Sequence, residues 1–198
     1  MTLSVQDIVL ENVETVKKFI KDVFPTTGIK GVYLAGGAAR SLKTNEPVVD
    51  YDLFFDSAET AENFEKGLLM RAKTEVIYRC PAGELVTIKM DKYKIQLIKE
   101  TYHPDPADLM ARFDFTICKF AVDCSDFSLQ YEDADMSDAY NKVLRLNNLQ
   151  YPVATLHRVK KYLDKGFAPP DWQWFWQDIL KRAAQIEMTD ENMALYID

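Results

Sequence analysis

The most constraining feature of the chain is the block at residues 36–55, GGAARSLKTNEPVVDYDLFF. Its glycine pair comes after the strand-like apolar run at residues 31–35 and precedes a helix-favouring segment at residues 38–42. A strand, a glycine turn and a helix in this order direct backbone N–H groups and the positive helix end toward an anion. A glycine pair alone is more often just a tight turn, so an anion site needs support from residues further along the chain.

Two aspartates supply that support. The run at residues 48–55 predicts a strand, on which Asp50 and Asp52 share one face. Their Cα atoms would lie roughly 6.5–7 Å apart, and like charges so placed repel each other. A divalent cation would compensate, because Mg²⁺ takes few carboxylates and completes its shell with substrate phosphates. The alternative is an exposed edge strand with two solvated acids. With the glycine pair and Arg40 upstream, the pattern favours a site for a nucleoside triphosphate and a metal ion.

The rest of the first 132 residues alternates between helical and strand periodicity. Helices are predicted over 4–24, 58–72 and from Pro106 to near Arg112. Strands are predicted over 74–80, 84–90, 93–98 and 127–131. This mixture predicts an α+β domain over residues 1–132.

No strand pattern remains after the acidic stretch at residues 132–138, so residues 133–198 are predicted to form a separate helical region. One helix is marked by Leu156, Val159, Tyr162 and Leu163. Another carries a stripe formed by Trp172, Phe175, Trp176, Ile179 and Leu180. Such stripes are more often core or subunit contacts than platforms for bases. The tryptophans are therefore left out of the predicted site, and contact between identical subunits through this region stays open.

Bulk properties narrow the class of function. The net charge of −7 disfavours a large nucleic-acid footprint, because neutralising phosphates requires a basic surface. No apolar run is long enough to span a membrane, and no signal peptide is evident at the N-terminus. The three cysteines lack the paired spacing of a zinc site. We therefore expect free thiols and a cytoplasmic protein without membrane partners.

Two blocks, in order, resemble one family. Gly36, Gly37, Arg40, Asp50 and Asp52 fall at the spacing of a GG-x-V-R-D motif followed by D-x-D. The segment at residues 112–118, RFDFTIC, is similar to the second motif, RRDFTINA. The family is the head domain of bacterial poly(A) polymerases and CCA-adding tRNA nucleotidyltransferases, within the DNA polymerase beta-like nucleotidyltransferase superfamily. The resemblance implies a mixed sheet flanked by helices, followed by a small helical neck-like region.

The implied activity is nucleotidyl transfer, in which an acceptor hydroxyl attacks the α-phosphate of a nucleoside triphosphate and pyrophosphate leaves. Asp50 and Asp52 would be the catalytic residues and would hold two Mg²⁺ (or Mn²⁺) ions. Gly36, Gly37 and Arg40 would bind the triphosphate of ATP or another nucleotide. Arg112 and Asp114 would help to shape the nucleotide pocket. The acceptor, whether an RNA 3′ end, a small molecule or a protein side chain, is not specified.

Asp114 has a second interpretation that needs no nucleotide. It lies with Thr116 among large apolar residues, so either side chain could instead cap the start of a helix.

The chain also departs from the family pattern. Ser41 stands where the first motif has aspartate, and in the second motif Phe113 and Cys118 replace an arginine and an asparagine. Many superfamily members carry a third acid on a neighbouring strand, where this chain offers the neutral Gln96, with Glu84 or Glu100 as other sources. The alternative function is therefore a catalytically weakened or inactive nucleotide-binding or assembly module on the same fold.

The base-reading residues of the family neck are replaced as well. Its aspartate and arginine correspond to Tyr151 and Ala154. CCA-adding specificity is therefore not expected.

Overall fold

The computed structural model describes residues 5–186 and residue 189, with side chains from residue 11 onward. The chain forms two compact units. The first comprises Met1–Met110 with Phe120–Tyr131, and the second comprises Ala111–Lys119 with Glu132–Asp198. The second unit thus includes a segment that the sequence assigned to the first domain, and the predicted division into 1–132 and 133–198 stays a prediction.

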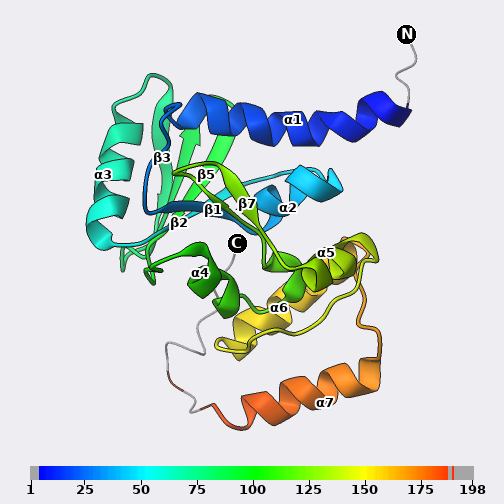
Figure 1. Cartoon of the computed structure of the whole chain (residues 1–198). Helices are drawn as coiled ribbons and strands as arrows, with labels where there is room; N and C mark the ends of the chain where they lie inside the picture. The colour runs from blue at the N-terminus through cyan, green and yellow to red at the C-terminus, as the bar shows by residue number, and fades with distance from the viewer. Residues whose placement is uncertain (1–4, 187–188, 190–198) are drawn as a thin grey trace. The chain divides into compact units, whose positions relative to one another are not determined.

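The first unit is built on a seven-stranded mixed sheet with the order β3-β4-β5-β2-β1-β6-β7 (Figure 1). The strands are β1 Val32–Ala35, β2 Tyr51–Phe55, β3 Thr74–Arg79, β4 Leu85–Met90, β5 Tyr93–Ile98, β6 Ala121–Asp123 and β7 Ser128–Gln130. The pairing of β2 with β5 is parallel and the other pairings are antiparallel. The predicted α+β class with a mixed sheet flanked by helices is confirmed.

One face of this sheet carries the apolar core. The helices of the unit are α1 Val5–Val23, α2 Gly37–Thr44, α3 Ala58–Leu69 and the start of α4 Pro106–Arg112. Phe19 of α1 stacks on Tyr51 of β2 with ring centroids 3.7 Å apart, and Phe64 of α3 lies 5.8 Å from Phe55. Because Tyr51 and Phe55 alternate with Asp52 along β2, the helix-covered face is opposite to the face that carries Asp52.

Two predicted elements end differently in the structure. The strand predicted over 48–55 begins only at Tyr51, because Ala35 is the last residue of β1 and pairs with Asp52, so β1 offers earlier residues no partner. The helix predicted over 58–72 ends at Leu69. Asp50 therefore lies in the connection that enters β2, one residue outside the strand.

The second unit is helical. It contains the short helix η1 Thr116–Cys118 and the helices α5 Asp133–Tyr140, α6 Pro152–Asp164 and α7 Trp172–Ala183. Its core includes Phe115, Ile117, Leu144, Phe167 and Phe175. Most of the acidic stretch at residues 132–138, where the sequence loses its strand pattern, belongs to the helix α5.

The aromatic stripe predicted on α7 is only partly buried. Phe175 and Ile179 face the core, whereas Trp172, Trp176 and Leu180 are exposed, the last at 68 %. The outer part of the predicted stripe packs mainly on itself, with the rings of Trp172 and Trp176 stacked 6.4 Å apart and both near Phe175.

Two further predictions can be compared with the structure. All three cysteines are free thiols, as predicted. Among the described residues, no helix combines the length and apolar character that crossing a membrane requires.

Candidate functional site

The site begins at the glycine corner between β1 and α2. Gly36 has φ 69° and ψ −135°, a conformation that is strained for any residue with a Cβ atom. Its N–H donates to the carbonyl of Phe120 at 3.0 Å, and its carbonyl accepts from the N–H of Arg40 at 3.0 Å. These bonds fix the corner between the sheet and the first turn of α2.

The second glycine leaves that corner open. A Cβ atom on Gly37 would meet no atom within 4 Å. Gly37 is the first residue of α2, and the first N–H groups of a helix have no acceptor within the helix. Open space beside backbone donors at the positive end of a helix dipole suits an anionic ligand.

Asp52 lies at this corner. It pairs with Ala35 of β1 on one side and with Gln96 of β5 on the other. A Cβ atom built on Gly36 would be 3.7 Å from Asp52 Oδ2, so the carboxylate and the glycine are neighbours. The strand register therefore brings an acid to the place where the helix dipole would attract phosphate.

Asp50 lies on the same face of the sheet. Lys94 and Gln96 alternate with buried apolar residues of β5 and so share one face. Asp52 pairs with Gln96, and the Asp50 carboxylate lies 3.6 Å from the Lys94 ammonium. Asp52 thus lies on the face of β2 opposite to Tyr51 and Phe55, and Asp50, one residue outside the strand, lies beside the side chain of Lys94.

The residue between the two aspartates adds no charge to the site. Tyr51 lies between them in sequence and is 4 % exposed. Burial raises the pKa of its phenol, which therefore stays neutral.

Arg40 is buried rather than directed outward. It is 2 % exposed, and its Nε and Nη2 atoms both lie 2.8 Å from Oε2 of Glu46. The hydroxyl of Ser41 donates to the Glu46 carbonyl at 2.6 Å. Arg40 and Ser41 together hold the connection that leads to Asp50 against α2. The predicted contact between Arg40 and a triphosphate stays a prediction.

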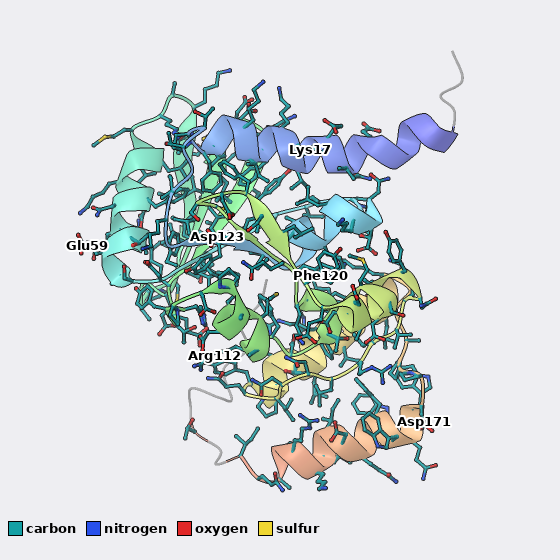
Figure 2. The ribbon with its side chains drawn as sticks, in the orientation of Figure 1. Lys17, Glu59, Arg112, Phe120, Asp123 and Asp171 are labelled. Atoms are coloured by element: carbon teal, nitrogen blue, oxygen red, sulfur yellow. The ribbon has the colours of Figure 1, made fainter. Side chains whose placement is uncertain are left out.

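The two remaining predicted residues belong to the second unit. Arg112 is exposed at the end of α4 (Figure 2). Asp114 is 8 % exposed and accepts from Arg158 Nη1 of α6 at 3.1 Å. The N-cap residue of the following helix η1 is Phe115, so neither Asp114 nor Thr116 occupies the N-cap position that the alternative gave them.

The sequence analysis missed the partners of the predicted residues. Glu46 binds Arg40, and Lys94 binds Asp50. Lys94 could have been found, because it lies two residues before Gln96 and must share its face. Nothing in the spacing identifies Glu46.

A third acid does not lie level with the aspartate pair on the neighbouring strands. Gln96 is the residue beside Asp52, and Thr87 of β4 is the residue beside Gln96. The Glu84 carbonyl accepts from the Lys99 N–H, three residues beyond Gln96, which is roughly 10 Å along the strand. The residues that could hold a divalent cation at the glycine corner are therefore Asp50 and Asp52. This donor set fits Mg²⁺, which binds one or two carboxylates and fills its shell with water and phosphate oxygens.

The fold described above is similar to that of solved nucleotidyltransferase structures. A complex of a CCA-adding enzyme with CTP is similar over 93 % of this chain and 46 % of that chain, with a TM-score of 0.60 and 16 % identity. A tRNA nucleotidyltransferase complexed with a primer tRNA and an incoming ATP analog is similar over 88 % of this chain and 50 % of that chain, with a TM-score of 0.56 and 21 % identity. The chain has the fold of a nucleotidyltransferase, which confirms the predicted resemblance at the level of the fold.

The family is shown by the sequence. The profile described as Gabija anti-defense 2 family protein matches residues 10–142. The chain belongs to this family. A relative from Bacillus phage SPbetaL7, named Gabija anti-defense 2, is 28 % identical over 136 residues, which are 68 % of this chain and 33 % of the relative. The chain thus spans about a third of the length of that relative.

Proposed function

We propose that the protein is a metal-dependent nucleotidyltransferase that transfers a nucleoside monophosphate from a nucleoside triphosphate to a hydroxyl acceptor. The observation that carries this proposal is the position of Asp52, whose carboxylate adjoins Gly36 at the start of α2. Phosphate binding by the backbone and metal binding by the acid then occur at one place. Similar structures include complexes of a CCA-adding enzyme with CTP and with ATP, which supports a nucleotide as the ligand.

Each part of the site has its own task. The N–H groups after Gly36 bind phosphate oxygens, and the Arg40–Glu46 pair holds the connection that positions Asp50. Asp50 and Asp52 would hold Mg²⁺ or Mn²⁺, which lowers the pKa of the acceptor hydroxyl and neutralises charge at the α-phosphate. The acceptor hydroxyl loses its proton to water, a bond forms between its oxygen and the α-phosphorus, the bond from that phosphorus to the bridging oxygen breaks, and pyrophosphate leaves.

The family name suggests where the reaction is used. We propose that nucleotidyl transfer serves to counteract the Gabija defence, inside the cytoplasm where nucleoside triphosphates are present. An acceptor that requires long contacts with a nucleic-acid backbone is disfavoured by the net charge of −7. A protein side chain, a small molecule and a short RNA 3′ end are the acceptor classes to test.

The test is an assay for pyrophosphate release and labelled product with each of the four radiolabelled nucleoside triphosphates, Mg²⁺ or Mn²⁺ and candidate acceptors. Replacing Asp50→Ala together with Asp52→Ala should reduce turnover by about 10³-fold or more, because the metal ligands are lost. A matched control, Glu59→Ala with Glu62→Ala, removes the same charge from the exposed side of α3 and should retain turnover. Turnover that persists in the aspartate double variant would contradict the proposal.

A second candidate function is a nucleotide-binding module without turnover. It is favoured by the neutral Gln96 beside Asp52, since a missing carboxylate weakens metal binding. Such a module would show a higher melting temperature with nucleotide and Mg²⁺ but no product. The same radiolabel assay therefore separates the two candidates.

A further inference from the structure

Two parallel rows of side chains cross the sheet on the face of the aspartates. The first row is level with the glycine corner. In this row Asp52 of β2 is the cross-strand neighbour of Gln96 of β5, and Gln96 is that of Thr87 of β4. Gln96 and Thr87 are 5 % and 3 % exposed. Beyond Asp52, this row therefore offers only neutral side chains on β5 and β4.

The second row is charged and internally balanced. It begins at Asp50, whose Oδ2 lies 3.6 Å from Lys94 Nζ. Lys94 of β5 pairs with Lys89 of β4, and Lys89 Nζ lies 3.9 Å from Glu75 Oε1 of β3. The negative charge of Asp50 thus already has a cation beside it, although the Lys94 side chain is 39 % exposed.

We infer that this edge of the sheet holds one divalent cation, at Asp52, and that the ammonium of Lys94 takes the place beside Asp50 of a second cation. The inference rests on the proposed function and sets its metal stoichiometry. A second divalent ion bound to Asp50 would also lie close to the Lys94 ammonium, and these two positive charges would repel each other. Gln96 offers only a neutral amide oxygen, whereas hard divalent cations prefer carboxylates.

The inference gives Lys94 a role that sequence similarity would not assign. An ammonium held by Asp50 keeps that carboxylate in place without a bound metal, so the site is assembled before nucleotide arrives. Lys94 then acts through its charge, which takes the place of a second metal ion beside Asp50. Its removal should strengthen metal binding, whereas a purely structural ion pair would leave metal binding unchanged.

The test is a titration of the full chain with Mn²⁺ in the absence of nucleotide, with free Mn²⁺ followed by electron paramagnetic resonance. We expect about one bound Mn²⁺ per wild-type chain, since Asp52 supplies the carboxylate for a single ion. Lys94→Met should tighten binding by about tenfold, because a nearby positive charge is lost. Lys94→Met combined with Gln96→Glu should bind about two ions, since both rows then offer a carboxylate.

Two control variants separate charge at this position from charge in general. Lys94→Arg keeps the cation and should behave as wild type. Lys89→Met removes the same charge one strand away and should change Mn²⁺ affinity by less than about threefold, because solvent and salt screen an exposed charge at that distance. Thermal unfolding of each variant establishes that it is folded.

The outcomes are distinct. Two Mn²⁺ ions per wild-type chain, or an unchanged affinity in folded Lys94→Met, would overturn the inference and leave the proposed function standing. No Mn²⁺ binding to wild type, with Asp52→Asn indistinguishable from it, would overturn the proposed function together with the inference.

Discussion

The two motif blocks of the chain resemble family patterns, yet their surroundings differ. In the first block, a Cβ atom on Gly37 would meet nothing within 4 Å and the Asp52 carboxylate lies beside Gly36, although Arg40 is paired with Glu46. In the second block, the carboxylate of Asp114 accepts from Arg158, and the hydroxyl of Thr116 donates to Asp138 at 2.8 Å. The comparison shows that a motif locates polar residues, whereas their partners decide whether they stabilise the fold or are available to a ligand.

The largest expected effect tests the structural side of this comparison. Asp114→Ala removes the carboxylate that accepts from Arg158 in a buried setting, where the loss of one partner of an ion pair is costly. We expect the free energy of unfolding to fall by about 2–4 kcal/mol. Chemical denaturation followed by circular dichroism measures the change.

The same helix offers a matched control. Lys160 and Asp164 of α6 form an exposed ion pair with side chains 77 % and 65 % exposed. Asp164→Ala should cost no more than about 0.5 kcal/mol, because water screens an exposed pair. If Asp114→Ala were equally mild and instead weakened nucleotide binding, the second block would belong with the first as a binding element.

A smaller effect is expected from the glycine pair of the first block. Gly36→Ala forces a Cβ atom into positive φ and should lower the free energy of unfolding by about 1–3 kcal/mol. Gly37→Ala has neither a positive φ nor a neighbour within 4 Å and should change stability by less than about 1 kcal/mol. Its methyl group nevertheless projects into the open corner, so KM for the nucleoside triphosphate should rise while stability holds. An unchanged KM in Gly37→Ala would show that phosphate does not bind at this corner.

Local patterns in the sequence were sufficient for most of the fold. The apolar alternation predicted all six residues of β5, Tyr93–Ile98, and Pro106 marked the start of α4. The prediction was wrong at the start of β2, because the end of a strand depends on where its partner leaves the sheet. The α7 stripe was predicted as core or subunit contact, and helical spacing could not show which of its residues reach the core, because it gives a face but not the width of the surface that covers it.

The site was predictable to a similar extent. The sequence placed Asp50 and Asp52 on one face and near the glycine pair, because the two-residue period of a strand is a local property. Strand spacing places Lys94 on the face of Gln96, but it could not show that Lys94 pairs with Asp50 or that Glu46 pairs with Arg40. Those pairs depend on the register between strands and on the path of a connection, which arise only when the sheet is assembled.

The smallest expected effect comes from two buried acids, one in each unit, which respond oppositely to pH. Glu65 of α3 in the first unit binds both Arg79 and Lys99. Burial alone would raise its pKa, but these two cations outweigh burial and lower the pKa below its ordinary value of 4.5. Burial raises the pKa of Asp135 in the second unit, where the single cation Lys119, 3.2 Å away, does not offset it.

The two shifts give opposite signs to the acid dependence of stability. The stabilisation from Glu65 is complete above about pH 4.5 and is lost as pH falls through the lowered pKa of the folded state. Asp135 destabilises the folded state above its raised pKa, and this cost disappears as pH falls. Glu65→Gln should therefore be less stable than wild type by about 1–2 kcal/mol at neutral pH, and this difference should shrink as pH falls through the lowered pKa. Relative to Asp135→Asn, wild type should instead gain stability as pH falls. Thermal unfolding of the three proteins in steps between about pH 3 and 7 measures both trends, and parallel trends would mean that Lys119 neutralises Asp135 as fully as Arg79 and Lys99 neutralise Glu65.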